Sequence, residues 1–226
     1  MSHLHVFDMD GTLIHGTSAA VQIARTCGTE AELLDLERRF SAGEIDTRAF
    51  SANLHALWAE LTEDHVDRAF GAAPFLAEIA EVCADIRARG ERSLVVTMST
   101  DFFANRLLDF GFDEVVASRF PPPPFREPLD PAGVLTPEDK VRATEDARSR
   151  AGIPLERCVA YGDSLSDAPL FRHVPHSVAV NADHHVALLA RAEYRGTSLM
   201  GAYTRGRALL ARDSTGGAAA REAAGG

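Results

Sequence analysis

The chain has 226 residues, of which 46% are hydrophobic and 25% are charged, and its formal net charge at pH 7 is −10. This composition is typical of a soluble globular protein, and the length suits one domain with an insertion or two small domains. The excess of acidic residues argues against nucleic acid or a membrane surface as a partner, but a bound metal ion or a local cation still allows an anionic small molecule to bind.

The first predicted element is the strand LHVF at residues 4–7, which is followed by Asp8 and Asp10. Two carboxylates so close together raise each other's pKa or require a cation, so the pair indicates either a solvated turn or a positively charged partner. The next segment, residues 16–74, has no good strand candidate and reads as several helices. They are SAAVQIARTC, AELLDLERRFSAG, TRAFSANLHALWAEL and EDHVDRAF.

From residue 75 onward, short apolar segments alternate with longer helical patterns, which is typical of a parallel α/β sheet. The predicted strands are 93–99, 114–118, 158–163 and 177–180. The predicted helices are a stripe of Leu76, Ile79, Cys83 and Ile86, the segment 101–111 and the segment 136–152. Thr136 can cap the last of these helices, and Pro137 fits its first position.

These elements predict an α/β fold with a Rossmann-like parallel sheet and an inserted all-helical cap. We expect residues 1–15 and 75–212 to form the core and residues 16–74 to form the cap. Residues 213–226 lack apolar anchors and are expected to be a disordered tail. Four consecutive prolines at 121–124 forbid a helix or a central strand, so this loop is either a stiff surface connection or a flap over a substrate site.

Cysteine usage and the N-terminus favour a cytoplasmic protein. Cys27, Cys83 and Cys158 are widely spaced, odd in number and set in apolar segments, so we interpret them as buried reduced thiols. The N-terminal apolar run is interrupted by Asp8, unlike a signal peptide, and no apolar run approaches the ~18 residues of a membrane span. We expect a monomer or a homodimer that binds neither nucleic acid nor membrane.

Polar residues stand where several predicted strands end. They are Asp8, Asp10, Ser99, Thr100, Asp163 and Asp167. Lys140 lies in the first turn of the helix that leads into the fourth predicted strand. Because ligands of open α/β sheets bind at the carboxyl ends of the strands, we expect these side chains to form one site.

These residues resemble the four motifs of a known family. DMDGTL at 8–13, a strand ending in Ser99, Lys140 and GDSLSD at 162–167 look like the motifs of the haloacid dehalogenase superfamily of phosphohydrolases. The resemblance is closest to the phosphoserine phosphatase-like branch. It implies a Mg²⁺-dependent phosphatase that hydrolyses a phosphomonoester of a small metabolite through an aspartyl-phosphate. A phosphotransferase or mutase that uses the same intermediate, and phosphoserine phosphatase itself, are the alternatives.

The resemblance also implies roles for the motif residues. Asp8 would be the nucleophile, and Asp10 would protonate the leaving alcohol and later activate water. Magnesium would bind the carboxylates of Asp8 and Asp163 and the backbone carbonyl of Asp10. Asp167 would orient Lys140 or a metal-bound water. The residues implied to bind the phosphoryl group are Gly11, Ser99, Thr100 and Lys140.

Several positions depart from the phosphoserine phosphatases. Thr17 stands where those enzymes carry a glutamate that binds the substrate's ammonium, and no arginine stands near Asn53, where they carry one for the carboxylate. Thr100 and Asp101 replace two glycines. These departures argue against phosphoserine as the substrate. We take His15, Thr17 and Asp101 as candidate specificity residues, although Asp101 could instead cap the helix that it opens.

Other residues have simpler explanations. We assign Phe50 and Trp58 to the interior of the predicted cap and His55 to its solvated face. Thr97 could share the phosphate-binding role of Ser99, and the sequence leaves that question open.

Overall fold

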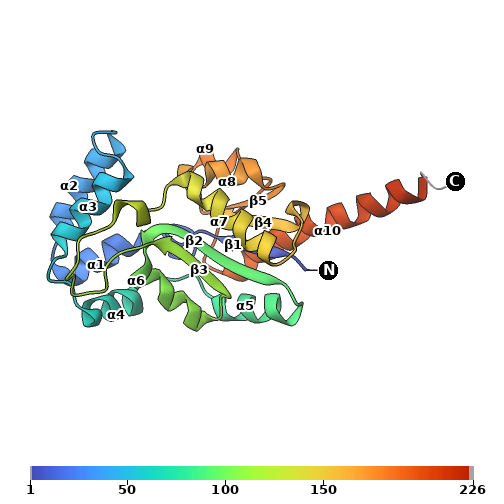
Figure 1. The fold of residues 1–226 in the computed structure, drawn as a ribbon. Helices are drawn as coiled ribbons and strands as arrows, with labels where there is room; N and C mark the ends of the chain where they lie inside the picture. The colour runs from blue at the N-terminus through green and yellow to red at the C-terminus, as the bar shows by residue number, and fades with distance from the viewer. Residues whose placement is uncertain (1, 224–226) are drawn as a thin grey trace.

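Six parallel strands form one sheet in the order β3-β2-β1-β4-β5-β6 in the computed structural model (Figure 1). The structure describes residues 2–223, with side chains through residue 212. The strands are β1 (Leu4–Phe7), β2 (Arg92–Thr100), β3 (Glu114–Ser118), β4 (Cys158–Gly162), β5 (His176–Val180) and β6 (Ala192–Tyr194). The strand order reverses direction between β1 and β4, and the carboxyl ends on either side of such a switch point are where these sheets bind ligands. The predicted α/β fold is confirmed.

The sheet is covered on both faces, which explains its nearly continuous apolar strands. Because neighbouring residues of a strand point to opposite faces, Val6 and Leu94 belong to one apolar cluster and Phe7 and Val95 to the other. One face packs against α7 (Pro137–Arg150), α8 (Ala168–His173) and α9 (His184–Ala187), and the other against α5 (Ile79–Ala88) and α10 (Leu199–Ala223).

Four helices lie between β1 and α5 and form a helical insertion at one end of the sheet (Figure 1, blue to teal). They are α1 (Ala19–Cys27), α2 (Glu30–Ser41), α3 (Thr47–Leu57) and α4 (Glu63–Ala72), close to the predicted positions. Side-chain oxygens of Ser18, Asp46 and Thr62 accept backbone N–H groups at the starts of α1, α3 and α4. The insertion also has apolar side chains of its own, and Trp58 is only 2% exposed.

The insertion leaves and rejoins the core through two adjacent segments. Ile14 and Phe75 form an antiparallel bridge. The N–H of His15 donates to the oxygen of Pro74 at 2.9 Å, and the N–H of Leu76 donates to the oxygen of Leu13 at 2.8 Å. The boundaries expected after residues 15 and 74 fall at this junction, and the division into a cap and a core stays a prediction.

Two details differ from the sequence-based expectation, and a third stays untested. The segment 101–111 is an α-helix only over α6 (Asp101–Ala104) and continues as a 3₁₀ helix over Asn105–Phe110, a difference that the pattern of so short a segment does not reveal. Strand β6 was not predicted, because it has three residues and only partial burial at the sheet edge. The backbone of α10 extends to Ala223, but side chains from Asp213 onward lie outside the described part, so disorder at 213–226 stays a prediction.

The proline-containing loop after β3 packs against the helical insertion. The ring of Phe125 stacks on that of His55 in α3, with centroids 4.7 Å apart and planes 8° apart. His55 Nε2 donates to the backbone oxygen of Glu127 at 3.0 Å. The interpretation of His55 as part of a solvated helix face is therefore wrong, because this loop covers its ring.

A buried glutamate connects β1, β4 and α10. Glu91 lies between His5 Nε2 at 3.0 Å, His3 Nδ1 at 2.7 Å and Arg207 Nη1 at 2.6 Å. The hydroxyl of Tyr161 donates to His5 Nδ1 at 3.1 Å, so neutral His5 satisfies both neighbours. Burial lowers the pKa of His5. Burial alone would raise the pKa of Glu91, but hydrogen bonds from its three partners lower it to about 2.

We expect Glu91→Gln to lower the free energy of unfolding at pH 7 by about 1–3 kcal/mol, because its buried partners lose a charged acceptor. The contribution of Glu91 is complete above its ordinary pKa of 4.5 and is lost as the pH falls toward 2, so the difference between variant and wild type should shrink over that interval. Buried His5 should also make the wild type less stable as the pH falls below 6.5. Urea unfolding from pH 7 to pH 3 measures both effects.

The exposed Glu193, which pairs with Arg195, provides the matched control. Glu193→Gln should change stability by less than about 0.5 kcal/mol at every pH. Equal effects of the two substitutions would contradict the role assigned to Glu91.

Candidate active site

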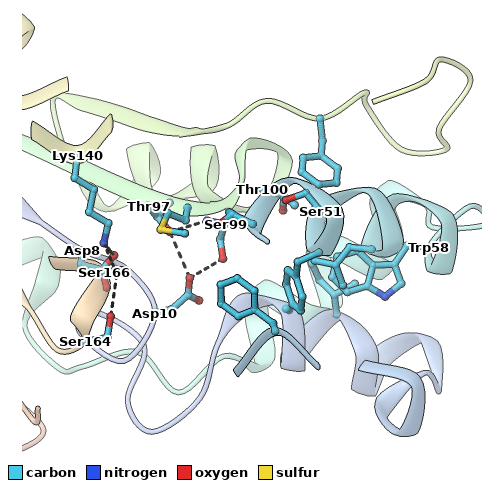
Figure 2. A pocket seen from close by; sticks show the side chains of 18 residues that line it. Asp8, Asp10, Ser51, Trp58, Thr97, Ser99, Thr100, Lys140, Ser164 and Ser166 are labelled. Carbon is cyan, nitrogen blue, oxygen red and sulfur yellow. Dashed lines mark hydrogen bonds and ion pairs between the residues drawn. The ribbon is translucent and has the colours of Figure 1, made fainter. Parts of the chain in front are cut away.

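The ends of three neighbouring strands bring the predicted site residues together (Figure 2). Asp8 follows β1, and its N–H donates to the oxygen of Tyr161 in β4 at 2.9 Å, which continues the sheet ladder by one residue. Ser99 and Thr100 end β2, and Asp163 follows β4. Since parallel strands all point their carboxyl ends to one edge, residues far apart in the sequence become neighbours here.

Lys140 lies at the centre of the site and is 1% exposed. Its Nζ atom donates to Asp8 Oδ1 at 2.6 Å, to Asp167 Oδ1 at 2.6 Å and to Ser166 Oγ at 3.2 Å. A capping box of Thr136 and Asp139 begins α7 and fixes the turn that carries Lys140. Burial disfavours the ammonium, but the charges of Asp8 and Asp167 outweigh this effect and raise the pKa of Lys140. Lys140 is therefore a cation at neutral pH.

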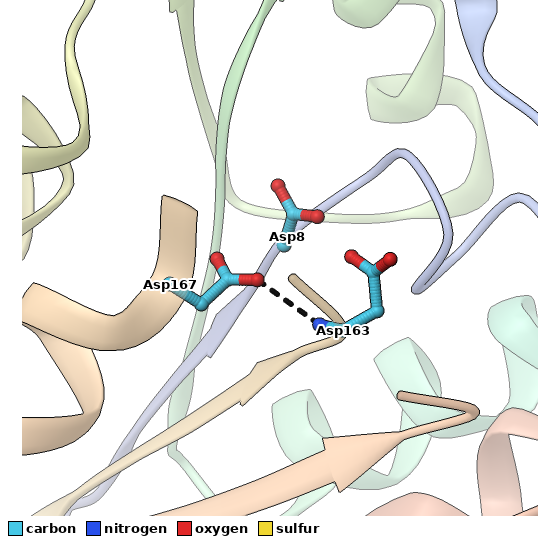
Figure 3. A group of neighbouring side chains, drawn as sticks. All are labelled: Asp8, Asp163 and Asp167. Carbon is cyan, nitrogen blue, oxygen red and sulfur yellow. Dashed lines mark hydrogen bonds between the residues drawn. The ribbon is translucent and has the colours of Figure 1, made fainter. Parts of the chain in front are cut away.

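Three carboxylates, Asp8, Asp163 and Asp167, have oxygen atoms within 4.8 Å of one another (Figure 3). Burial and the charge of Asp167 raise the pKa of Asp8 despite the contact with Lys140, and the same two causes raise the pKa of Asp163 to about 7. One lysine cannot balance three carboxylates, so the site has an excess of negative charge. A divalent cation would remove this excess.

The hydrogen bonds indicate which of the three carboxylates can bind a metal. Both oxygens of Asp167 are occupied, Oδ1 by Lys140 and Oδ2 by the N–H groups of Asp163 and Ser164 at 3.0 and 3.1 Å. Among the described residues, only the Thr12 hydroxyl donates a hydrogen bond to the Asp163 carboxylate, and this bond is long at 3.4 Å. The donor set of Asp8 and Asp163 fits magnesium, which prefers a few carboxylate oxygens. Asp167 contacts Lys140, and its predicted role of orienting this lysine stays a prediction.

Asp10 points away from this cluster. Its Oδ1 accepts the N–H of Ala19 at 2.6 Å, at the start of α1, and its Oδ2 accepts the hydroxyls of Ser99 at 2.6 Å and Thr97 at 3.3 Å. Burial raises the pKa of Asp10 and outweighs these hydrogen bonds, which favours the protonated carboxyl. Thr97 therefore positions Asp10, and Ser99 contacts it as well. The predicted role of the Asp10 backbone carbonyl as a metal ligand stays a prediction.

Residue 11 must be a glycine because the carboxylate of Asp163 leaves no space for a side chain there. Its φ is +78°, and a Cβ atom at this position would lie 2.0 Å from Asp163 Oδ2. Its N–H donates to the oxygen of Thr17 at 3.3 Å. The sequence assigned Gly11 to close approach of a phosphate, whereas the contact present in the structure is with Asp163. Glycine thus leaves room for the predicted metal ligand.

A cavity of about 160 Å³ opens beside these groups. One end is polar and contains Asp8, Asp10, Ser99 and Lys140. The other end lies under the helical insertion and is lined mainly by apolar and hydroxyl side chains, namely Ala20, Ile23, Phe40, Thr47, Phe50, Ser51, Leu54, Trp58, Met98, Thr100 and Phe120. Phe50 and Trp58 thus contribute to the cavity wall as well as to the interior of the insertion.

The structure does not place the predicted specificity residues in this cavity. His15 and Thr17 line a separate hollow, which shares Asp10 and Ser164 with the cavity and also includes Asp163. The hydroxyl of Thr17 accepts from Gln22 Nε2 at 3.2 Å, and His15 Nδ1 accepts from Asn181 Nδ2 at 3.2 Å. The carboxylate of Asp101 accepts the N–H of Phe120 at 3.1 Å, and Thr100, not Asp101, stands at the N-cap position of α6. Asp101 therefore anchors the loop after β3.

Sequence reasoning missed the part of the cavity wall that α3 contributes. Thr47, Ser51, Leu54 and Trp58 recur at helical spacing and belong to one face of that helix and its carboxyl end. This periodicity was the available signal, but it cannot distinguish a face that packs inside the insertion from one that faces a cavity.

Comparison with known proteins places this arrangement in a family. The family model described as haloacid dehalogenase-like hydrolase matches residues 5–172. The chain belongs to the haloacid dehalogenase-like hydrolase family. A phosphoserine phosphatase of Idiomarina loihiensis is 30% identical over 203 residues, which cover 85% of this chain and 87% of that protein. A phosphoserine phosphatase of Methanocaldococcus jannaschii is 25% identical over 178 residues, covering 78% and 84%.

This haloacid dehalogenase-like hydrolase also shares its fold with a solved structure of a substrate-bound phosphoserine phosphatase. The TM-score is 0.73 at 22% identity, and the match covers 88% of this chain and 96% of that chain. The predicted resemblance is confirmed, and the protein is an enzyme, a phosphatase similar to the phosphoserine phosphatases. In the described part of the chain, no helix combines the length and the apolar character needed to cross a bilayer.

Two glycine substitutions test the geometry around Asp163. Gly11 and Gly16 have similar backbones, with φ of +78° and +67°, but a Cβ at Gly16 would meet no atom within 4 Å. Both alanine variants should incur backbone strain of roughly 1–3 kcal/mol. Only Gly11→Ala should also displace Asp163, so it alone should lower kcat/KM by more than about 100-fold in magnesium. Steady-state kinetics with thermal unfolding of both variants separates the effects, and equal activity losses would refute the assigned contact.

Proposed function

We propose that this hydrolase is a magnesium-dependent phosphatase that hydrolyses a phosphomonoester of a small metabolite through a phosphorylated Asp8. The observation that carries the proposal is the different environment of the two aspartates. Asp8 contacts Lys140 and lies in the carboxylate cluster, whereas Asp10 is in a separate buried position with a raised pKa. Carboxylates in unlike surroundings can divide the roles of nucleophile and acid between them.

In the first half of the reaction, an oxygen of Asp8 attacks phosphorus while the bond from phosphorus to the leaving oxygen breaks. Asp10 transfers its proton to that oxygen, and the alcohol departs. Lys140 orients Asp8 and balances part of the charge of the phosphoryl group. Bound magnesium supplies the remaining positive charge. Asp8 and Asp163 are the carboxylates that would hold it.

In the second half, water attacks the phosphorus of the aspartyl-phosphate, and the bond between phosphorus and Asp8 breaks. Asp10, now a carboxylate, takes the proton from the water, which restores both aspartates and releases inorganic phosphate. Hydroxyls of Ser99 and Thr97 hold Asp10 in place through both halves. The helical insertion covers the cavity and supports the proposal of a cap that limits access of bulk water during the first half.

Phosphate release from a panel of metabolite monoesters, with magnesium and with chelator, tests this function. We expect release only with magnesium. Addition of an acceptor alcohol distinguishes hydrolysis from phosphotransfer, because a phosphotransferase would move the phosphoryl group to the added alcohol at the expense of free phosphate.

Substitution of the two aspartates should affect different steps. Asp8→Asn should lower kcat by at least about 10³-fold, because the nearly isosteric amide removes the nucleophile. Asp10→Asn should lower it by about 10²–10⁴-fold, since the general acid is lost while Asp8 can still be phosphorylated by an ester with a good leaving group. Quench-flow measurement of protein-bound phosphate separates the two variants. Asp109→Asn, on an exposed position, is the control, and activity of Asp8→Asn within tenfold of wild type would refute the mechanism.

Magnesium should stabilise the wild type, and Asp163 should be needed for this effect. A ligand present at 100 times its dissociation constant adds about 2.7 kcal/mol to the free energy of unfolding. In chelator, Asp163→Asn should be more stable than wild type, because one of three crowded carboxylates becomes neutral. In magnesium, the variant should show little further stabilisation. Thermal unfolding in both buffers measures these shifts, and a full magnesium response in Asp163→Asn would exclude it as a ligand.

A further inference from the structure

The end of the cavity that lies under the helical insertion carries no formal charge. Its wall includes Ile23, Phe50, Leu54, Trp58, Met98 and Phe120. The polar atom of Trp58 is already used, because its Nε1 donates to the hydroxyl of Thr29 at 3.3 Å. Among the described residues that line the cavity, Lys140 is the one basic side chain, and it belongs to the reacting end.

Two hydroxyl groups stand between the reacting end and this apolar wall. Thr100 is 5% exposed, and its Oγ1 atom is buried without any hydrogen-bond partner, the one such side-chain atom in the described part of the protein. Ser51 is 4% exposed and likewise has no side-chain hydrogen bond to another described residue. Figure 2 shows Thr100 and Ser51 between Ser99 and Trp58.

A buried hydroxyl without a hydrogen-bond partner destabilises the folded protein unless a ligand supplies that partner. The neighbouring Thr97 illustrates the contrast, since its hydroxyl is used by Asp10 at 3.3 Å. Thr100 Oγ1 has no surface open to the cavity, whereas the unpartnered hydroxyl of Ser51 is not enclosed in this way, so Ser51 marks a position where a polar atom of the substrate fits. Apart from the groups of the reacting end, no charged side chain lines the cavity near this position, so the substrate atom that fits there is uncharged.

We infer that the substrate is the phosphomonoester of an apolar alcohol, with a leaving group about the size of one aromatic ring or a short branched chain. The leaving group carries a neutral hydroxyl, ether or carbonyl oxygen close to the phosphoryl group, which contacts Ser51. It carries no ammonium or carboxylate. The cavity of about 160 Å³ includes the reacting end, and a protein cavity of about that volume holds a benzene ring, so the leaving group is limited to about one ring in size. This inference rests on the proposed phosphatase function.

The physical basis is the difference between apolar and charged leaving groups in this cavity. An apolar group gains by leaving water for the wall of Phe50, Leu54 and Trp58. An ammonium or a carboxylate would lose its hydration and find no opposite charge there. The cavity thus selects against amino-acid and multiply charged leaving groups, although it lies in a protein similar to phosphoserine phosphatases.

The first test compares kcat/KM for 2-phenylethyl phosphate, 2-hydroxy-2-phenylethyl phosphate, phosphoserine and glycerol 3-phosphate in magnesium. We expect the two aromatic esters to be preferred over the other two by at least about 100-fold. Equal or better turnover of phosphoserine would overturn the inference and leave the proposed function intact. Absence of turnover and of protein-bound phosphate with all four esters would overturn both.

Calorimetric binding of the intact esters to the Asp8→Asn variant gives a readout that does not depend on turnover. Dissociation constants should follow the same order, with the aromatic esters at least about tenfold tighter than phosphoserine. Equal affinities would overturn the inference even if the wild type hydrolyses every ester.

Two variants test which residues cause the preference among the esters. Phe50→Ala should reduce the preference for the aromatic esters by about tenfold or more, whereas Phe110→Ala, a half-buried phenylalanine away from the cavity, should keep it. Ser51→Ala should lower the kcat/KM ratio of the hydroxylated to the plain aromatic ester by about tenfold. An unchanged ratio in Ser51→Ala would overturn the role of its hydroxyl, and an unchanged preference in Phe50→Ala would overturn the role of the wall.

Discussion

The ammonium group of Lys140 is buried between Asp8 and Asp167, and the rest of the site is arranged around it. An isolated ammonium would not persist in such a position, because its desolvation is offset only by close carboxylates. These two carboxylates come from the end of β1 and from the turn after β4, so Lys140 connects both strands to α7. Removal of either contact would leave a buried charge without its partner. The sheet and the site therefore stabilise each other.

The same arrangement supports the proposed binding of a metal ion. Asp163 adds a third carboxylate that Lys140 does not contact, and burial raises its pKa. Folding thus brings together more negative charge than the protein itself neutralises. A substrate dianion would increase this excess further, which is why the proposed chemistry depends on a divalent cation as well as on Lys140.

The sequence was sufficient to predict the sheet and the reacting end of the site. Asp8, Ser99 and Asp163 each follow or end an apolar strand, and a parallel sheet brings such positions to one edge whatever the details of packing. The cap of α7 predicted only its helix, and Lys140 was assigned to the site from its place among the family motifs. Strand β6 and the 3₁₀ continuation of α6 were not, because short elements at an edge depend on tertiary contacts more than on pattern.

The substrate end could not be predicted, because it depends on how the insertion folds over the sheet. Thr17 is close to Asp10 in sequence, yet it lines a separate hollow and not the cavity. Phe50 and Trp58 are distant from the motifs in sequence, yet they reach the cavity through the packing of α3. Proximity along the chain was therefore a poor guide to proximity in the site.

The loop after β3 has a mechanical consequence for this enzyme. Phe120 at its start forms part of the cavity wall, and Phe125 and Glu127 further along hold His55 of α3. The consecutive prolines between these contacts make the connection stiff. The loop therefore joins Phe120 in the cavity wall to His55 of α3, so a displacement of α3 is expected to reach Phe120 through a stiff connection.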